Sequence, residues 1–118
     1  MTIYLSGPIT GSHDFKVVFN RVRQELEEGG EHLVINPAVL AGVATEGVLS
    51  YEDYMAIDQT LLSKAQVLML LPGWQDSPGC NRELGYAEAL GLMIFEYDEN
   101  GGHFGPFKGW RPTDDRAG

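Results

Sequence analysis

The run Val67-Leu68-Met69-Leu70-Leu71 constrains the fold of this chain more than any other feature. Its five apolar residues do not alternate with polar ones, so the run predicts a strand over residues 66–71 that is covered on both faces. A strand buried on both faces is typical of a parallel sheet that carries helices above and below it. The chain should therefore fold as an α/β domain around this strand.

Short strand patterns and helical patterns alternate along the rest of the chain. Strands are expected at 3–5, 33–35, 66–71 and 92–97, and helices at about 14–28, 50–65 and 80–90. This order predicts a parallel sheet of four to five strands with helices on both faces and right-handed crossovers. The inward helix positions are expected to be Phe15, Val18, Phe19, Val22 and Leu26, then Tyr54, Ile57, Leu61, Leu62 and Ala65, then Leu84, Ala87 and Leu90.

Turn and cap residues mark the ends of these elements. Asp14 or Ser12 can cap the first helix, and Ser50 caps the second, with Asp53 in a capping-box position. Residues 38–50 lack a clear period and are expected to form a loop with at most one helical turn. Ser77 can be the N-cap of the third helix, with Pro78 at its first position.

Length and charge limit the classes of protein and partner. The 118 residues suit one domain, which we place at 1–97, followed by a glycine-rich and charged tail at 98–118 that we expect to dock on the domain or on a partner subunit. A net charge of −9 argues against polymeric nucleic acid and anionic membranes as partners. The absence of a signal or membrane-spanning pattern and the lone Cys80 predict a cytoplasmic protein.

Three loops leave the carboxyl ends of the expected strands, where open parallel sheets bind ligands. These loops are residues 6–13, 36–50 and 72–79. In the first, Gly7 and Gly11 let the backbone approach a ligand, although a tight strand-to-helix turn explains them as well. Trp74 in the third loop either stacks on a base or covers the sheet edge.

Two acids lie near this edge of the sheet. Glu83 sits on a small, apolar face of the third helix, where a carboxylate is costly to bury, so we interpret it as a reactive group rather than a surface acid. Asp58 lies beside the buried stripe of the second helix, where it is either a second reactive acid or the partner of a nearby base. Free amides at Ser77 favour a phosphate there, although Ser77 can also be a simple cap.

Cysteine and metal chemistry are disfavoured. No histidine is placed to activate Cys80, which we expect to serve packing, and the scattered histidines do not show the spacing of a zinc site. No metal and no organic cofactor are therefore expected.

Three motifs together resemble the nucleoside 2-deoxyribosyltransferase superfamily, which includes the 2'-deoxynucleoside 5'-monophosphate N-hydrolases. They are Tyr4-Leu5-Ser6-Gly7-Pro8-Ile9, Asp58 with Leu61, Leu62 and Ala65, and Ser77-x-Gly79-x-x-x-Glu83-x-Gly85-x-Ala87. The likeness covers residues 3–96 and is greatest to small phage and bacterial members whose activity is uncharacterised. It implies a flavodoxin-like, Rossmann-type sheet and a homodimer or higher homo-oligomer.

The resemblance also implies roles for single residues. Glu83 matches the glutamate that attacks C1' of the sugar, and Asp58 matches the aspartate that assists departure of the base. Position 77 is aspartate in transferases and serine in the monophosphate hydrolases, so Ser77 favours a hydrolase. The other residues expected to bind the substrate are Tyr4, Ser6, Gly7, Ile9, Gly11, Trp74 and Gly79.

The sequence thus predicts an N-glycosidase that hydrolyses a nucleoside 5'-monophosphate to a free base and a sugar 5-phosphate. Two carboxyl groups suit this reaction because it needs a nucleophile and a proton for the leaving base. A nucleoside 2-deoxyribosyltransferase and a nucleotide-binding protein without turnover stay open as alternatives. The chain departs from the family in its tail and in its first loop, which lacks the arginines that some hydrolases place beside the phosphate.

Overall fold

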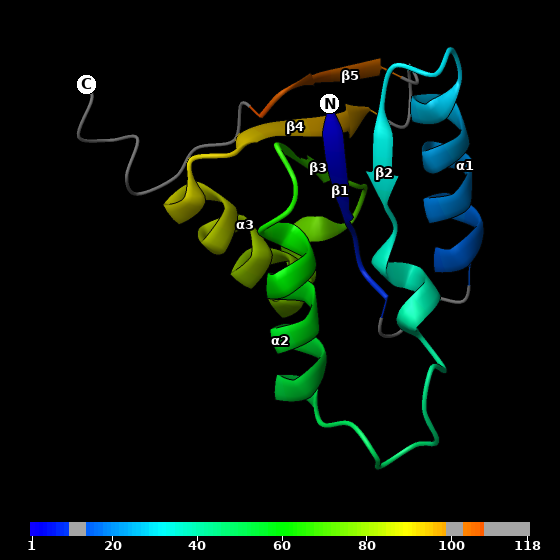
Figure 1. Ribbon diagram of the computed structural model, residues 1–118, viewed down its shortest axis with the longest axis vertical. Coiled ribbons are helices and arrows are strands. Elements are labelled where there is room, and N and C mark those ends of the chain that lie inside the picture. The colour runs from blue at the N-terminus through cyan, green and yellow to red at the C-terminus, as the bar shows by residue number, and fades with distance from the viewer. Residues whose placement is uncertain (10–13, 99–102, 108–118) are drawn as a thin grey trace.

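A five-stranded sheet forms the centre of the molecule (Figure 1). The computed structural model describes residues 1–9, 14–98 and 103–107. The sheet order is β2-β1-β3-β4-β5, with β1 (Thr2–Ser6), β2 (Leu33–Ile35), β3 (Val67–Leu70), β4 (Met93–Asp98) and β5 (His103–Pro106). The first four strands are parallel, and β5 pairs antiparallel with β4. The predicted α/β fold is confirmed, and the order of its parallel strands is that of flavodoxin-like sheets.

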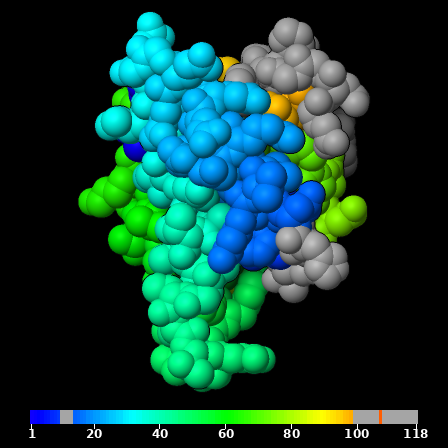
Figure 2. Space-filling view, turned by 90° about the vertical axis from the view of Figure 1, so that its right-hand side faces the viewer, coloured from blue at the N-terminus to red at the C-terminus, as the bar shows by residue number. Residues whose placement is uncertain are grey.

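Helices cover both faces of the sheet, as expected. Figure 1 shows α1 (Phe15–Glu27) on one side and the pair α2 (Tyr51–Leu62) and α3 (Pro78–Leu90) on the other. Two short 3₁₀ helices, η1 (Pro37–Leu40) and η2 (Trp74–Asp76), lie in the loops after β2 and β3. The segment from η1 to α2 projects from the body of the molecule (Figure 2).

The two-residue period of the strands divides the core into two clusters. Ile3 and Leu5 of β1 pack with Val67 and Met69 of β3 against α1. Tyr4 faces the other way, into the cluster under α2 and α3 that also holds the side chains of Leu68 and Leu70. Because β3 contributes to both clusters, its uninterrupted apolar run is explained.

The predicted helix starts are confirmed at α2 and α3. Ser50 and Asp53 form a capping box, in which the Ser50 hydroxyl accepts from the Asp53 N–H at 3.0 Å and the Asp53 carboxylate accepts from the Ser50 N–H at 2.8 Å. Ser77 caps α3, with Pro78 at the first helical position. These caps satisfy amides that a helix start leaves unpaired.

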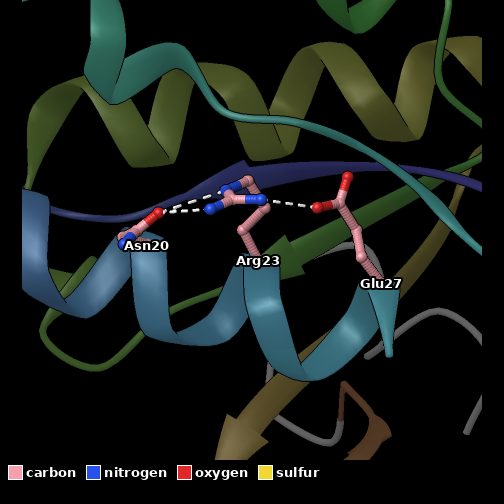
Figure 3. Close-up of polar contacts among 3 residues, drawn as sticks. All are labelled: Asn20, Arg23 and Glu27. Carbon is pink, nitrogen blue, oxygen red and sulfur yellow. Dashed lines mark hydrogen bonds and ion pairs between the residues drawn. The ribbon is translucent and has the colours of Figure 1, made fainter. Parts of the chain in front are cut away.

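Polar side chains line the outer side of α1. Arg23 lies between Asn20 and Glu27 there, and its guanidinium donates to both side chains (Figure 3). The contact to Glu27 is an i,i+4 ion pair of 2.6 Å. Phe19, Val22 and Leu26 are buried beneath α1, as predicted.

One predicted core position is exposed in the structure, and one buried position was not predicted. Leu90 was expected to face inward, but 43% of it is exposed. The buried stripe of α3 steps from Cys80 to Leu84 and Ala87, so its next position is Gly91, where the helix ends in the left-handed conformation. On α2, Met55 is buried although the expected stripe did not include it.

Part of the segment after residue 97 joins the sheet. β5 extends the sheet beyond β4, and the Phe107 N–H donates to the Ile94 carbonyl at 3.0 Å. The Phe107 ring meets the Trp74 ring edge-on, with the ring centroids 5.4 Å apart. Trp110 lies outside the described residues. None of the helices within residues 1–9, 14–98 and 103–107 is long and apolar enough to cross a membrane.

Candidate active site

A cavity of about 670 Å³ opens at the carboxyl edge of the sheet, beside β1 and β3. The strand order reverses between these two strands, which is where open α/β sheets bind ligands. The volume is in the range of small-molecule sites. Its lining residues come from all three loops singled out in the sequence and from the facing helices: Leu5, Gly7, Pro8, Ile9, Phe19, Pro37, Leu40, Ala41, Tyr51, Tyr54, Met55, Asp58, Gly73, Asp76, Ser77, Pro78, Gly79, Cys80 and Glu83.

Glu83 is a buried acid in the wall of this cavity. Only 6% of it is exposed, and both carboxylate oxygens accept hydrogen bonds from β1. The Tyr4 hydroxyl donates to Oε2 at 2.5 Å, and the Ser6 hydroxyl donates to Oε1 at 2.7 Å. These two bonds fix the orientation of the Glu83 carboxyl group. Glu83 therefore needs little reorientation to act on a ligand.

The geometry of β1 explains why Tyr4 and Ser6 meet the same carboxyl group. Residues two apart on a strand point to the same face, and the even-numbered residues of β1 face α3. Both side chains are buried, and neither lines the cavity. The structure thus places Tyr4 and Ser6, which the sequence assigned to substrate binding, behind Glu83 as its hydrogen-bond donors.

Burial perturbs the titration of this group of side chains. Loss of solvent raises the pKa of Glu83 from 4.5 to about 7, and the hydrogen bonds from Tyr4 and Ser6 limit this rise. The nearby charge of Asp58 raises the pKa of Glu83 further. The pKa of Tyr4 is raised, chiefly by burial and by the charge of Glu83, so its hydroxyl stays protonated and donates.

Asp58 reaches the same cavity from α2. Burial raises its pKa, while interactions with the side chains of Glu83 and Tyr4 lower it. The two acids therefore influence each other, although 25 residues and a strand separate them in the chain. Carboxyl groups whose environments differ in this way can take separate roles as nucleophile and acid.

The start of α3 forms another part of the wall. Ser77, Gly79 and Cys80 line the cavity, and the Ser77 hydroxyl accepts from the Cys80 N–H at 3.3 Å. A β-carbon at Gly79 would meet only ordinary contacts, the nearest being the Tyr51 hydroxyl at 3.8 Å. Cys80 packs in the apolar cluster under α3, and burial raises the pKa of its thiol, which keeps it protonated.

Gly7 serves packing as well as the cavity. A β-carbon there would lie 2.9 Å from the β-carbon of Leu71 and 3.2 Å from the Phe19 ring. The close approach of the chain after β1 to the end of β3 therefore requires glycine, whether or not a ligand is bound. Ile9 lines the cavity, and Gly11 lies outside the described residues.

Trp74 does not line the cavity. Its indole N–H donates to Glu96 of β4 at 3.1 Å, and its ring packs against Phe107. Of the two interpretations left open by the sequence, the structure places Trp74 in the packing at the β4 side of the sheet.

Several lining residues were not singled out in the sequence. Tyr51, Tyr54 and Met55 come from the first turn and a half of α2, and Asp76 comes from η2. The spacing of Tyr51 and Tyr54 puts both on one helix face, but only the fold shows that this face borders a cavity. Of the charged side chains, the described lining contains three acids, Asp58, Asp76 and Glu83, and no lysine, arginine or histidine.

Cation binding finds no support in the described part of the chain. Across residues 1–9, 14–98 and 103–107, no group of three or more histidine, cysteine, aspartate or glutamate side chains is arranged to hold a metal ion.

Comparison with known proteins gives one family and several similar folds. The family model described as "Domain of unknown function (DUF4406)" matches residues 1–96. No curated protein matches the chain significantly.

The similar solved structures include a 2-deoxyribosyltransferase from Leishmania mexicana, with 23% identity and a TM-score of 0.61 over 82% of this chain. The chain spans 65% of the length of that protein. A 2-deoxyribosyltransferase from Bacillus psychrosaccharolyticus has 23% identity and a TM-score of 0.58, over 84% of this chain and 74% of its own. The CMP N-glycosidase of Clostridium botulinum has 21% identity and a TM-score of 0.55, over 85% of this chain and 73% of its own.

Proposed function

We propose that this chain, which belongs to the DUF4406 family and has a fold similar to that of 2-deoxyribosyltransferases, cleaves the N-glycosidic bond of a nucleotide or nucleoside. The observation that carries the proposal is the buried carboxyl group of Glu83, held by Tyr4 and Ser6 in the wall of the cavity. Burying a carboxyl group destabilises a fold, so a function is the best reason for keeping it there.

In the proposed reaction, Glu83 attacks C1' of the sugar. The C1'–N bond breaks as the Glu83–C1' bond forms, and the electron pair of the broken bond leaves with the base. Asp58 supplies the proton that the departing base needs. Water then attacks C1', its proton returns to Asp58, and Glu83 is released as a carboxylate. The products are a free base and the sugar.

The titration of Glu83 is compatible with its role at and above neutral pH. A nucleophilic carboxylate must be ionised, and Glu83, with a pKa of about 7, is ionised in half or more of the molecules at and above neutral pH. Burial raises the pKa of Asp58, which favours the protonated form that a proton donor needs, whereas its interactions with Glu83 and Tyr4 lower that pKa. The hydrogen bonds from Tyr4 and Ser6 favour the ionised form of Glu83 and orient it.

We further propose that the substrate is a nucleoside 5'-monophosphate. Ser77 supports this because its hydroxyl, unlike a carboxylate, does not repel a phosphate, and because it lies at the start of α3, where the helix dipole favours an anion. The acids in the cavity favour the alternative, transfer of deoxyribose between bases from an uncharged nucleoside. A third candidate, nucleotide binding without turnover, needs only the cavity.

Release of free base tests these possibilities. The purified chain would be incubated with ribo- and deoxyribonucleoside 5'-monophosphates and with the matching nucleosides, and the products separated by chromatography. We expect base and sugar 5-phosphate from at least one monophosphate. With a nucleoside and a second base present, formation of an exchanged nucleoside would favour the transferase, and binding without any product would favour the binding protein.

Matched variants connect the activity to the site. Glu83→Gln should lower base release at least a thousand-fold, since loss of a covalent nucleophile removes the reaction path. Glu88→Gln changes an exposed glutamate of the same helix that does not line the cavity and should keep full activity. Equal activity of the two variants would refute Glu83 as the nucleophile.

A further inference from the structure

The charges around the cavity do not match a phosphate. The described lining carries the acids Asp58, Asp76 and Glu83 and no cationic side chain. A nucleoside 5'-monophosphate carries close to two negative charges at neutral pH and would be repelled by these acids. A positive side chain at the rim of the cavity would remove this conflict.

Arg82 lies beside Tyr51, a residue that lines the cavity. It follows Gly79 by three residues on α3, so the two share one helix face. Its guanidinium lies 5.5 Å from the centre of the Tyr51 ring, and Tyr51 lines the cavity with its hydroxyl close to Gly79. The Tyr51 side chain therefore lies between Arg82 and the cavity. The long side chain of an arginine can reach past it.

Arg82 now pairs with a carboxylate that is easily replaced. Its two terminal nitrogens donate to the two oxygens of Glu52, at 2.9 and 3.3 Å. The side chains are 41% and 72% exposed, respectively. An exposed ion pair adds little stability, so exchanging Glu52 for another anion loses little.

Resting on the proposed function, we propose that Arg82 joins Ser77 in recognising the 5'-phosphate of the substrate, and that Glu52 holds Arg82 beside the cavity until the phosphate takes the place of the carboxylate. A guanidinium binds phosphate through two parallel hydrogen bonds, as it binds Glu52 here. The face of Tyr51 keeps the guanidinium beside the cavity during the exchange.

The proposal makes Glu52 a competitor of the substrate. Removing the charge of Glu52 frees Arg82 and should strengthen binding of a phosphate. If the Arg82–Glu52 pair only joined α2 to α3, loss of either partner would break the same contact, and the two variants would change phosphate binding in the same direction. The two single variants therefore distinguish recognition from structure.

Calorimetry tests the proposal. The four deoxynucleoside 5'-monophosphates and the four matching deoxynucleosides would be titrated into the Glu83→Gln protein, which prevents turnover. Arg82→Gln should weaken binding of a monophosphate roughly ten-fold, as expected for loss of a charge-assisted hydrogen bond, and change nucleoside binding less than two-fold. Glu52→Gln should tighten monophosphate binding two-fold or more. Arg23→Gln is the matched control, because it removes an arginine–glutamate ion pair on α1 that does not line the cavity.

Three results would overturn the proposal. The first is equal weakening of nucleoside and monophosphate by Arg82→Gln; the second is weaker monophosphate binding in Glu52→Gln; the third is a parent protein that binds monophosphates no better than nucleosides. If Arg82→Gln does not fold, as judged by its thermal transition, the Glu52→Gln affinities decide. Arg82-dependent binding by a chain that releases no base would support this inference and refute the N-glycosidase.

Discussion

Replacing Glu83 by glutamine should stabilise the fold, and increasingly so as the pH rises. In the folded chain the pKa of Glu83 is about 7, against 4.5 for a free glutamate. Between these two values the folded state holds a proton that the unfolded chain has lost. The free energy of unfolding of the wild type therefore falls as the pH rises from 4.5 through 7.

The size of the effect follows from the shift. Each pKa unit corresponds to about 1.4 kcal/mol, so the difference between the two pKa values amounts to about 3 kcal/mol. Glutamine cannot ionise, and its amide oxygen still accepts a hydrogen bond from Tyr4 or Ser6. The stability of the variant relative to the wild type should thus rise by about 3 kcal/mol between pH 4 and pH 8. The carboxylates of Glu52 and Asp53, whose pKa values are lowered by hydrogen bonds from Arg82 and Ser50, are present in both proteins and cancel in the difference.

Urea unfolding at a series of pH values measures this difference. Circular dichroism would follow the transition, and the midpoint and slope give the free energy of unfolding of each protein. Subtracting the wild-type curve from the curve of the variant removes the contributions of groups that titrate alike in both. A difference that stays constant from pH 4 to pH 8 would refute the buried and perturbed state of Glu83.

Three further substitutions, one of them a control on the exposed side of α3, test the surroundings of the site. Tyr4→Phe removes a hydroxyl that lowers the pKa of Glu83, so the acid limb of the kcat/KM profile should move to higher pH by about one unit; an unchanged limb would contradict the role of this bond. Gly7→Ala should destabilise the chain by about 1–3 kcal/mol in urea unfolding, because the new β-carbon would meet Leu71 at 2.9 Å. Gly85→Ala on the exposed side of α3, where nothing lies within 4 Å, should instead stabilise it by roughly 0.5–1 kcal/mol; equal effects of the two changes would count against the packing argument.

The fold was predictable because local signals agree along the chain. The unalternating run at 67–71 predicted a central strand with helices on both sides, and the serines at 50 and 77 predicted where two helices begin. The prediction for Leu90 was wrong because the buried stripe of α3 passes from Ala87 to Gly91 and not to Leu90. A short helix defines the direction of its buried stripe poorly, so the helical period alone did not show this. β5 was not assigned as a strand, since a glycine-rich segment with one pairing partner gives little pattern.

The site was predictable only in part. Single positions such as Asp58 and Glu83 could be selected because acids beside apolar stripes are unusual, and the structure brings both to one cavity. The hydrogen bonds from Tyr4 and Ser6 could not be predicted, because they join residues 79 and 77 positions apart and depend on which helix covers each face of β1. The wall formed by Tyr51 and Asp76 likewise depends on how α2 and η2 meet. The homo-oligomeric state stays a prediction.

A covalent sugar on Glu83 is the most direct test of the proposed chemistry. The wild type would be mixed with the nucleotide that releases base fastest, quenched in acid within milliseconds, and analysed by intact mass and peptide mapping. We expect an added mass of one sugar 5-phosphate on the peptide that contains Glu83, and none in Glu83→Gln. Base release with no adduct on the wild type, together with full activity of Glu83→Gln, would contradict the proposed chemistry.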